Sequence, residues 1–158
     1  MIVIREADTP DDISTAASLF EEYAASLDVD LGFQGFADEL ATLPGHYAAP
    51  QGALLLAWEG DIALGCVALR ALEPPAIAEL KRLYVRPAGR GQAIGSRLSQ
   101  AAIARAKQIG YERIRLDTLS SMLAAQRLYE SLGFYEIPPY RYNPVPDTRY
   151  LELLVQGV

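Results

Sequence analysis

The chain has 158 residues, of which 51% are hydrophobic and 22% charged, and this balance suits one compact domain over residues 1–158. Its formal net charge of −6 argues against nucleic acid as a partner, because nonspecific binding to phosphate backbones requires many lysines and arginines. One cysteine, Cys66, excludes an internal disulfide, and without a signal peptide or an apolar run of about 18 residues we expect a cytoplasmic protein that holds no metal and binds no membrane.

The first third of the chain predicts one strand and two helices. Residues 2–5 are strand-forming, and residues 8–12 contain the Thr-Pro pair and the aspartates typical of a helix start. Apolar residues then recur at helical spacing from Ile13 to Leu27, so an amphipathic helix is expected there. A shorter helix is expected over residues 34–43, before Pro44.

The middle of the chain predicts an antiparallel meander followed by a helix. Its three strands are expected over residues 53–58, 62–72 and 76–85, separated by a Glu-Gly-Asp turn and a Pro-Pro pair. After a glycine-rich turn, apolar residues from Ile94 onward share one helical face, and Gly110 is placed to end that helix.

The last third predicts a strand over residues 112–118, a helix over 122–132, and two strands over 134–136 and 149–155. Because a helix joins the strand before it to the strand over 112–118, we expect those two strands to be parallel neighbours. This order of elements indicates an α+β (mixed α/β) domain built in layers.

The turn between the third strand and its helix, RPAGRGQAIGSRL, predicts either a phosphate site or a plain connection. A strand that leads through glycines into a helix directs several unpaired backbone N–H groups to one point, and such a point attracts phosphate. Gly91 and Gly95 would let a ligand approach the backbone closely. Glycine-rich turns of this kind are also often purely structural.

The stretch ELKRLYVRPAGRGQAIGSRL resembles the acyl-CoA-binding motif of the GNAT superfamily of N-acetyltransferases, Arg/Gln-x-x-Gly-x-Gly/Ala. The match in register runs from Arg90 to Gly95, with Ala93 where the family usually has glycine. Alanine in place of glycine requires a negative φ at this position and room for one methyl group, and we expect both at Ala93. A register starting at Arg86 also fits the pattern but is rejected, because it places Pro87 inside the loop. The stretch AAQRLYESLGF is similar to a second block of the family.

The resemblance implies a mixed, mostly antiparallel sheet of about six to seven strands flanked by about four helices. The strands over 76–85 and 112–118 would splay apart into a V-shaped groove for the pantetheine arm of acetyl-CoA, with the pyrophosphate on the amides that follow. The cofactor-binding residues that it implies are Leu83, Tyr84, Val85, Arg90, Gly91, Gln92, Ala93, Ile94, Gly95, Ser96 and Tyr129.

Two residues are candidates for catalysis. The resemblance assigns Tyr129 to protonation of the CoA sulfur, although its helical spacing also fits a core residue. Glu79 is the candidate base, acting through water because a commonly used base position of the family corresponds to Leu83. Even spacing predicts that Glu79, Lys81, Leu83 and Val85 share one face of the strand. Alternatively, Glu79 is a solvent-facing partner of a basic residue.

The implied reaction is acetyl transfer from acetyl-CoA to a primary amine of a small molecule, amino acid or peptide N-terminus, by direct attack in a ternary complex. Candidate acceptor-binding residues are Glu79, Arg82, Asp117, Tyr140 and Tyr142. A catalytically silent acyl-CoA-binding regulatory module is the alternative. Members of the superfamily often dimerise, and a homodimer stays open for this chain.

Overall fold

The computed structural model describes residues 1–27 and 30–155, with the side chains of residues 33 and 34 left out. The predicted domain of residues 1–158 therefore includes two short stretches, 28–29 and 156–158, that lie outside the described residues. The strands are β1 (Ile2–Glu6), β2 (Ala53–Glu59), β3 (Ile62–Glu73), β4 (Ile77–Val85), β5 (Arg113–Thr118), β6 (Tyr135–Ile137) and β7 (Arg149–Leu154). The helices are α1 (Pro10–Ser26), α2 (Phe36–Thr42), α3 (Ile94–Ile109) and α4 (Leu123–Ser131), with single 3₁₀ turns η1 (Leu31–Gln34), η2 (Gly45–Tyr47) and η3 (Pro87–Gly89).

The described strands form one sheet in the order β1-β2-β3-β4-β5-β7-β6. Every neighbouring pair is antiparallel except β4 and β5, which are parallel. These findings confirm the predicted α+β class and the parallel pair. The second helix is shorter than expected, because Gly35 adopts a left-handed φ of 71° and separates η1 from α2.

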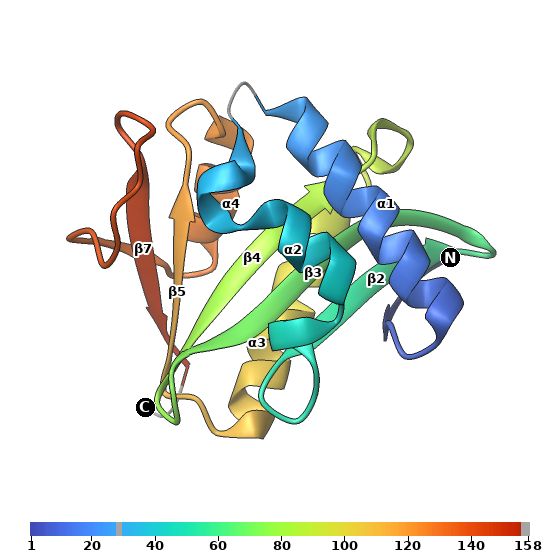
Figure 1. The fold of residues 1–158 in the computed structure, drawn as a ribbon, viewed down its shortest axis with the longest axis horizontal. Coiled ribbons are helices and arrows are strands. Elements are labelled where there is room, and N and C mark those ends of the chain that lie inside the picture. The colour runs from blue at the N-terminus through green and yellow to red at the C-terminus, as the bar shows by residue number, and fades with distance from the viewer. Residues whose placement is uncertain (28–29, 156–158) are drawn as a thin grey trace.

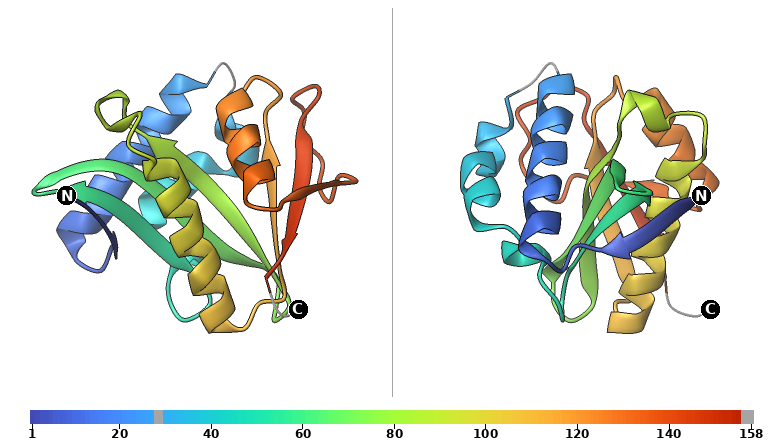
Figure 2. Two further views of the ribbon diagram at one scale, coloured as in Figure 1. Left: turned by 180° about the vertical axis from the view of Figure 1, so that it is seen from behind. Right: turned by 90° about the vertical axis from the view of Figure 1, so that its right-hand side faces the viewer.

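The helices form a layer on each side of the sheet. Figures 1 and 2 show α1 and α2 on one face and α3 and α4 on the other. Leu19 and Phe20 of α1 are buried in one apolar cluster, and Leu98 and Ala102 of α3 in a second cluster across the sheet. None of the helices in the described part of the chain is long and apolar enough to span a bilayer.

The parallel pair opens after a short stretch of contact. β4 and β5 pair only from Ile77 opposite Arg113 to Glu79 opposite Arg115, and the two ribbons then diverge (Figure 1). This is the V-shaped splay that the family resemblance implies. Since β4 remains paired with β3 as far as Val85, its opposite edge presents backbone N–H and C=O groups to the gap.

A β-bulge in β4 reverses the alternation of its side chains. Cys66 pairs with Tyr84 but Ala68 pairs with Lys81, so both Arg82 and Leu83 face the single residue between them on β3. Arg82 has a φ of 62°, which is unusual for a residue with a side chain. A bulge of this kind bends a strand and redirects the residues that follow.

The prediction that Glu79, Lys81, Leu83 and Val85 share one face is therefore wrong. Lys81 lines a cavity on the α2 side of the sheet, whereas Leu83 and Val85 pack against the apolar cluster on the α3 side. The extra residue of the bulge shifts the alternation by one position, which even spacing in the sequence does not reveal.

Candidate active site

The turn after β4 leads into α3, and no side chain caps the N-terminus of this helix. Its first helical bond runs from the N–H of Arg97 to the carbonyl of Ala93, so the N–H groups of Ile94, Gly95 and Ser96 belong to the unpaired first turn. Gly91 has a φ of 82°, and no atom lies within 4 Å of the place a side chain would take. Unpaired amides at the positive end of a helix, beside an open glycine, fit a phosphate group.

Ala93 differs from its expected conformation. Its φ is 59° and its ψ 25°, in the left-handed region, so the predicted negative φ is wrong. The residue is exposed, and its methyl group therefore has room although its backbone is strained. A left-handed backbone costs a non-glycine residue about 1–2 kcal/mol, which explains why glycine suits this position.

Arg86, the first residue of the rejected motif register, anchors the turn to α1. Its guanidinium donates to both carboxylate oxygens of Glu22, the shortest contact being 2.7 Å, and to the carbonyl of Ala63 at 2.8 Å. Arg90 and Gln92, in the accepted register, are exposed on the turn. Arg86 is thus engaged by α1, whereas Arg90 is exposed on the turn.

The gap between β4 and β5 forms a groove, the splay groove, whose lining includes Leu80, Leu83, Asp117, Thr118, Met122 and Tyr129. At the start of α3, Gly95 lets the helix pack closely against its neighbours, since an added Cβ would lie 3.5 Å from Leu128 of α4 and 3.7 Å from Val85 of β4. The space itself is small, about 40 Å³, and Tyr129 is among the residues that line it.

Tyr129 is only 6% exposed, and its ring packs against Phe134 with 5.5 Å between ring centroids. Its hydroxyl has no hydrogen-bond partner in the part of the chain that the structure describes. Burial raises the pKa of the phenol above its usual value, with smaller contributions from Tyr23 and Asp117. The hydroxyl is therefore protonated at neutral pH and can donate.

On the other side of the β4 bulge lies a cavity of about 330 Å³, the α2 cavity. Its lining includes Glu39 of α2, His46 of η2, Arg70 of β3, Lys81 of β4, and Arg141 and Tyr142 of the loop before β7. Lys81 also lines the splay groove, so the two spaces adjoin at this residue. A molecule in the α2 cavity can thus approach a ligand in the groove.

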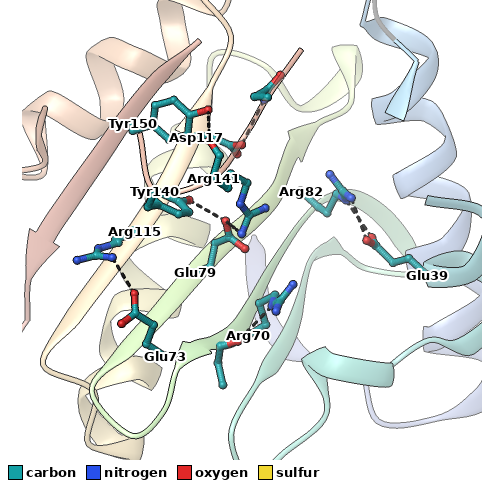
Figure 3. A network of polar contacts seen from close by, with 12 residues as sticks. Glu39, Arg70, Glu73, Glu79, Arg82, Arg115, Asp117, Tyr140, Arg141 and Tyr150 are labelled. Atoms are coloured by element: carbon teal, nitrogen blue, oxygen red, sulfur yellow. Dashed lines mark hydrogen bonds and ion pairs between the residues drawn. The ribbon is translucent and has the colours of Figure 1, made fainter. Parts of the chain in front are cut away.

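Glu79 is fully buried beside this cavity, so the alternative of a solvent-facing glutamate is wrong. Its Oε2 lies 2.6 Å from Nη2 of Arg141 and accepts a hydrogen bond from the Tyr140 hydroxyl at 2.7 Å (Figure 3). Its Oε1 is buried without a partner among the described residues. A buried carboxylate oxygen with no partner carries a large desolvation cost, which a water or ligand would relieve.

The other predicted acceptor residues have different surroundings. Arg82 donates to both oxygens of Glu39 at 2.9 Å and lies over the ring of Phe36. Its guanidinium group is therefore already bound to residues of α2. Asp117 accepts from Asn143 at 3.4 Å and lines the splay groove. Tyr142 is 84% exposed at the rim of the α2 cavity.

Arg70 was not singled out from the sequence. It is the one charged residue inside the long apolar run of β3 and lies directly opposite Glu79 in the sheet. A lone charge in an otherwise buried strand is a signal of a polar site, because an unpaired charge is costly to bury.

The electrostatics of the α2 cavity disfavour an ammonium group. The pKa of Lys81 is lowered to about 8, chiefly by burial and also by Arg82 and Arg141, against the opposing effect of Glu79 and Asp117. The same surroundings would favour the neutral form of another amine placed there. No group of three or more histidine, cysteine or acidic side chains in the described ranges is arranged to hold a metal ion.

The model of the acetyltransferase (GNAT) family matches residues 16–134, three quarters of the chain. The chain belongs to the GNAT family of acetyltransferases. An uncharacterized N-acetyltransferase of Schizosaccharomyces pombe is 40% identical over 153 residues, which cover 96% of this chain and 94% of the relative. The N-acetylaspartate synthetase of Xenopus tropicalis is 35% identical over 88 residues, or 56% of this chain and 32% of the relative.

Solved structures share this GNAT fold. A GNAT-family acetyltransferase of Staphylococcus aureus superposes with a TM-score of 0.81 at 21% identity, covering 99% of this chain and all of the other. An acetyltransferase of Salmonella typhimurium, solved with acetyl-CoA, superposes with a TM-score of 0.70 at 21% identity, covering 99% and 95% of the two chains. At 21% identity, these superpositions show a shared fold alone.

The left-handed backbone of Ala93 predicts a stabilising substitution. In Ala93→Gly, relief of the strained φ outweighs the added flexibility of the unfolded chain, so the free energy of unfolding should rise by up to about 1 kcal/mol in urea denaturation. Ala88→Gly, in η3 with a negative φ, is the matched control and should be destabilising. Equal losses in both variants would contradict the assigned backbone conformation.

The buried Lys81 predicts a pH-dependent gain in stability when its charge is removed. Folding lowers the pKa of Lys81 from 10.5 to about 8, so below about pH 8 the folded state carries a buried ammonium that the unfolded state solvates better. Lys81→Met should raise the free energy of unfolding by about 1–3 kcal/mol at pH 7. This gain should shrink between pH 8 and 10.5, where the folded wild type loses the proton first.

Denaturation curves at several pH values test this prediction. Lys107→Met, at an exposed position of α3, controls for the loss of a lysine. The same pH dependence in both variants, or a loss of stability in Lys81→Met at pH 7, would contradict it.

Proposed function

We propose that this GNAT acetyltransferase transfers the acetyl group of acetyl-CoA to the primary amine of a small molecule, amino acid or peptide N-terminus by direct attack in a ternary complex. The observation that carries the proposal is the meeting of the splay groove and the α2 cavity at Lys81. Two ligands in adjoining spaces can react without a covalent enzyme intermediate. The relative named N-acetylaspartate synthetase supports an amino acid among these acceptors.

We assign the groove and the turn before α3 to acetyl-CoA, which supplies the activated acetyl thioester when bound. The unpaired amides of Ile94, Gly95 and Ser96, together with the open Gly91, would hold the pyrophosphate. The free edge of β4 around Leu83 and Val85 would offer backbone N–H and C=O groups to the pantetheine arm. Backbone N–H groups at this edge are also suited to polarise a thioester carbonyl.

We assign the general acid to Tyr129. Its hydroxyl, without a described partner and lining the groove, would donate a hydrogen bond and then a proton to the departing sulfur. Because burial raises the pKa of this phenol, it keeps its proton until negative charge develops on the sulfur. Stabilisation of that charge by the hydrogen bond is then the larger part of its effect.

We assign the proton acceptor to Glu79, acting through water. Oε2 is committed to Arg141 and to the Tyr140 hydroxyl, which fix the orientation of the carboxylate. Oε1 remains for a water molecule that relays the proton of the acceptor amine. The cationic surroundings of Lys81 assist this step, since they disfavour a second ammonium.

Loss of the Tyr129 hydroxyl should slow turnover without weakening cofactor binding. For Tyr129→Phe we expect kcat to fall by about 10²-fold or more, measured as CoA release across an amine panel, with unchanged acetyl-CoA affinity in calorimetry. Tyr111→Phe is the control, because it removes a hydroxyl that bonds the carbonyl of Gln51 at 2.6 Å far from the groove. Normal acetyl-CoA binding by the wild type with no acetylation of any amine would instead support the silent binding module.

Removal of the Glu79 charge should produce a defect that depends on pH. For Glu79→Gln we expect kcat to fall by about 10- to 100-fold at neutral pH, and the defect to narrow as the pH approaches the amine pKa of about 10. Glu73→Gln, whose exposed carboxylate pairs with Arg115, is the matched control. A raised KM with an unchanged pH profile would mean that Glu79 only positions Arg141.

A further inference from the structure

The floor of the α2 cavity gathers cationic side chains from three separate segments. Arg70 comes from β3, Lys81 from β4 and Arg141 from the loop before β7, and all three line the cavity. Arg70 and Glu79 are directly opposite each other in the sheet, and Arg141 reaches the same Glu79. Figure 3 shows Arg141 beside Glu79, and Arg70 on the neighbouring strand β3.

The acidic residues nearby leave part of this positive charge unbalanced. Glu79 offsets Arg141, and both oxygens of Glu39 are committed to Arg82. The described contact of Arg70 is a bond from its Nε to the carbonyl of Ala71 at 3.2 Å, and within the described ranges no carboxylate pairs with it. Asp38, the other acidic residue of the lining, is exposed on α2. Arg70 therefore lines the cavity without an ion-pair partner among the described residues.

We propose that the α2 cavity is a carboxylate-binding site for the acetyl acceptor, with Arg70 and the free edge of Arg141 binding the carboxylate and the amine directed toward Lys81. This inference rests on the proposed function and narrows its acceptor to small amines that carry a carboxylate. A guanidinium fork matches the planar carboxylate through two parallel hydrogen bonds. The volume of about 330 Å³ suits a small molecule.

The same cations discriminate against other amines. An acceptor that carries only an ammonium group would meet the three positive side chains of Arg70, Lys81 and Arg141, while of the two acidic residues in the lining Glu39 is committed to Arg82 and Asp38 is exposed on α2. An acceptor with a carboxylate gains a charge-assisted pair at Arg70, and its amine then lies where an ammonium is disfavoured. Specificity therefore comes from repulsion of simple amines as well as from attraction of the acid.

Matched acceptors test the inference on the wild-type enzyme. We would compare glycine, β-alanine and L-aspartate with the amide of each acid and with alkylamines of equal length, measuring acetyl-CoA-dependent CoA release. The acids should have a kcat/KM at least about tenfold higher than their amides, since a hydrogen bond between two charged groups is stronger than one to a neutral amide. Amides or alkylamines that react as well as the acids would overturn the carboxylate site.

Substitution of Arg70 tests the residue itself. In Arg70→Gln the KM for the acids should rise about 10- to 100-fold while the kinetics of the amides stay unchanged, and Arg70→Lys should recover part of the loss. Arg105→Gln makes the same change at a residue that pairs with Glu6 near β1, and it should leave acceptor kinetics unchanged. An equal effect of Arg70→Gln on acids and amides would overturn the assignment.

Acetyl-CoA binding, measured by calorimetry for each variant, shows that the variant is folded and separates this inference from the proposed function. Acetylation of simple amines alone would overturn the carboxylate site and leave the acetyltransferase proposal intact. If the wild type does not bind acetyl-CoA, or acetylates none of the acceptors, the proposed function is overturned, and this inference with it.

Discussion

The bulge at Arg82 in β4 is the constraint on which the site depends. It places a residue with a side chain at a φ of 62°, a conformation that costs about 1–2 kcal/mol. The contacts that hold it include the guanidinium of Arg82 on Glu39 and the thiol of Cys66, which donates to the Arg82 carbonyl at 3.3 Å. Because of this bulge, Lys81 faces the α2 cavity while Leu83 faces the α3 side. The α2 cavity and the splay groove therefore adjoin at β4.

The second constraint is the concentration of charge inside the domain. Glu79, Lys81 and Arg82 lie within four residues of one strand, and none is more than 9% exposed. Burial of such groups rarely stabilises a fold more than apolar side chains of similar size would. Glu79 has an oxygen without a described partner, and burial lowers the pKa of Lys81, so this part of the sheet is costly for stability. A functional demand on these residues explains that cost, because buried and perturbed charges cluster at active sites.

The helices, the strands and the glycine-rich turn before α3 could be predicted, because they depend on residues close together in the sequence. The periodicity of α3, the glycines of its preceding turn and the Tyr129 helix all depend on neighbours within a few residues, and the strands agree with their predicted positions to within two residues. The conformation of Ala93 was not predictable, because its φ depends on how the turn enters α3. Nor was the engagement of Arg82, whose partner Glu39 is 43 residues away in the chain.

The sequence by itself thus determined the order of elements, the GNAT resemblance and the side chains capable of acid and base chemistry, because each of these depends on residue type and short-range spacing. The tertiary structure alone decided which faces those side chains occupy. A single extra residue in β4 redirects the residues after it, and strand pairing brings Arg70 beside Glu79. Loop packing then adds Arg141 from a third segment, so the charge of the cavity is a property of the folded chain.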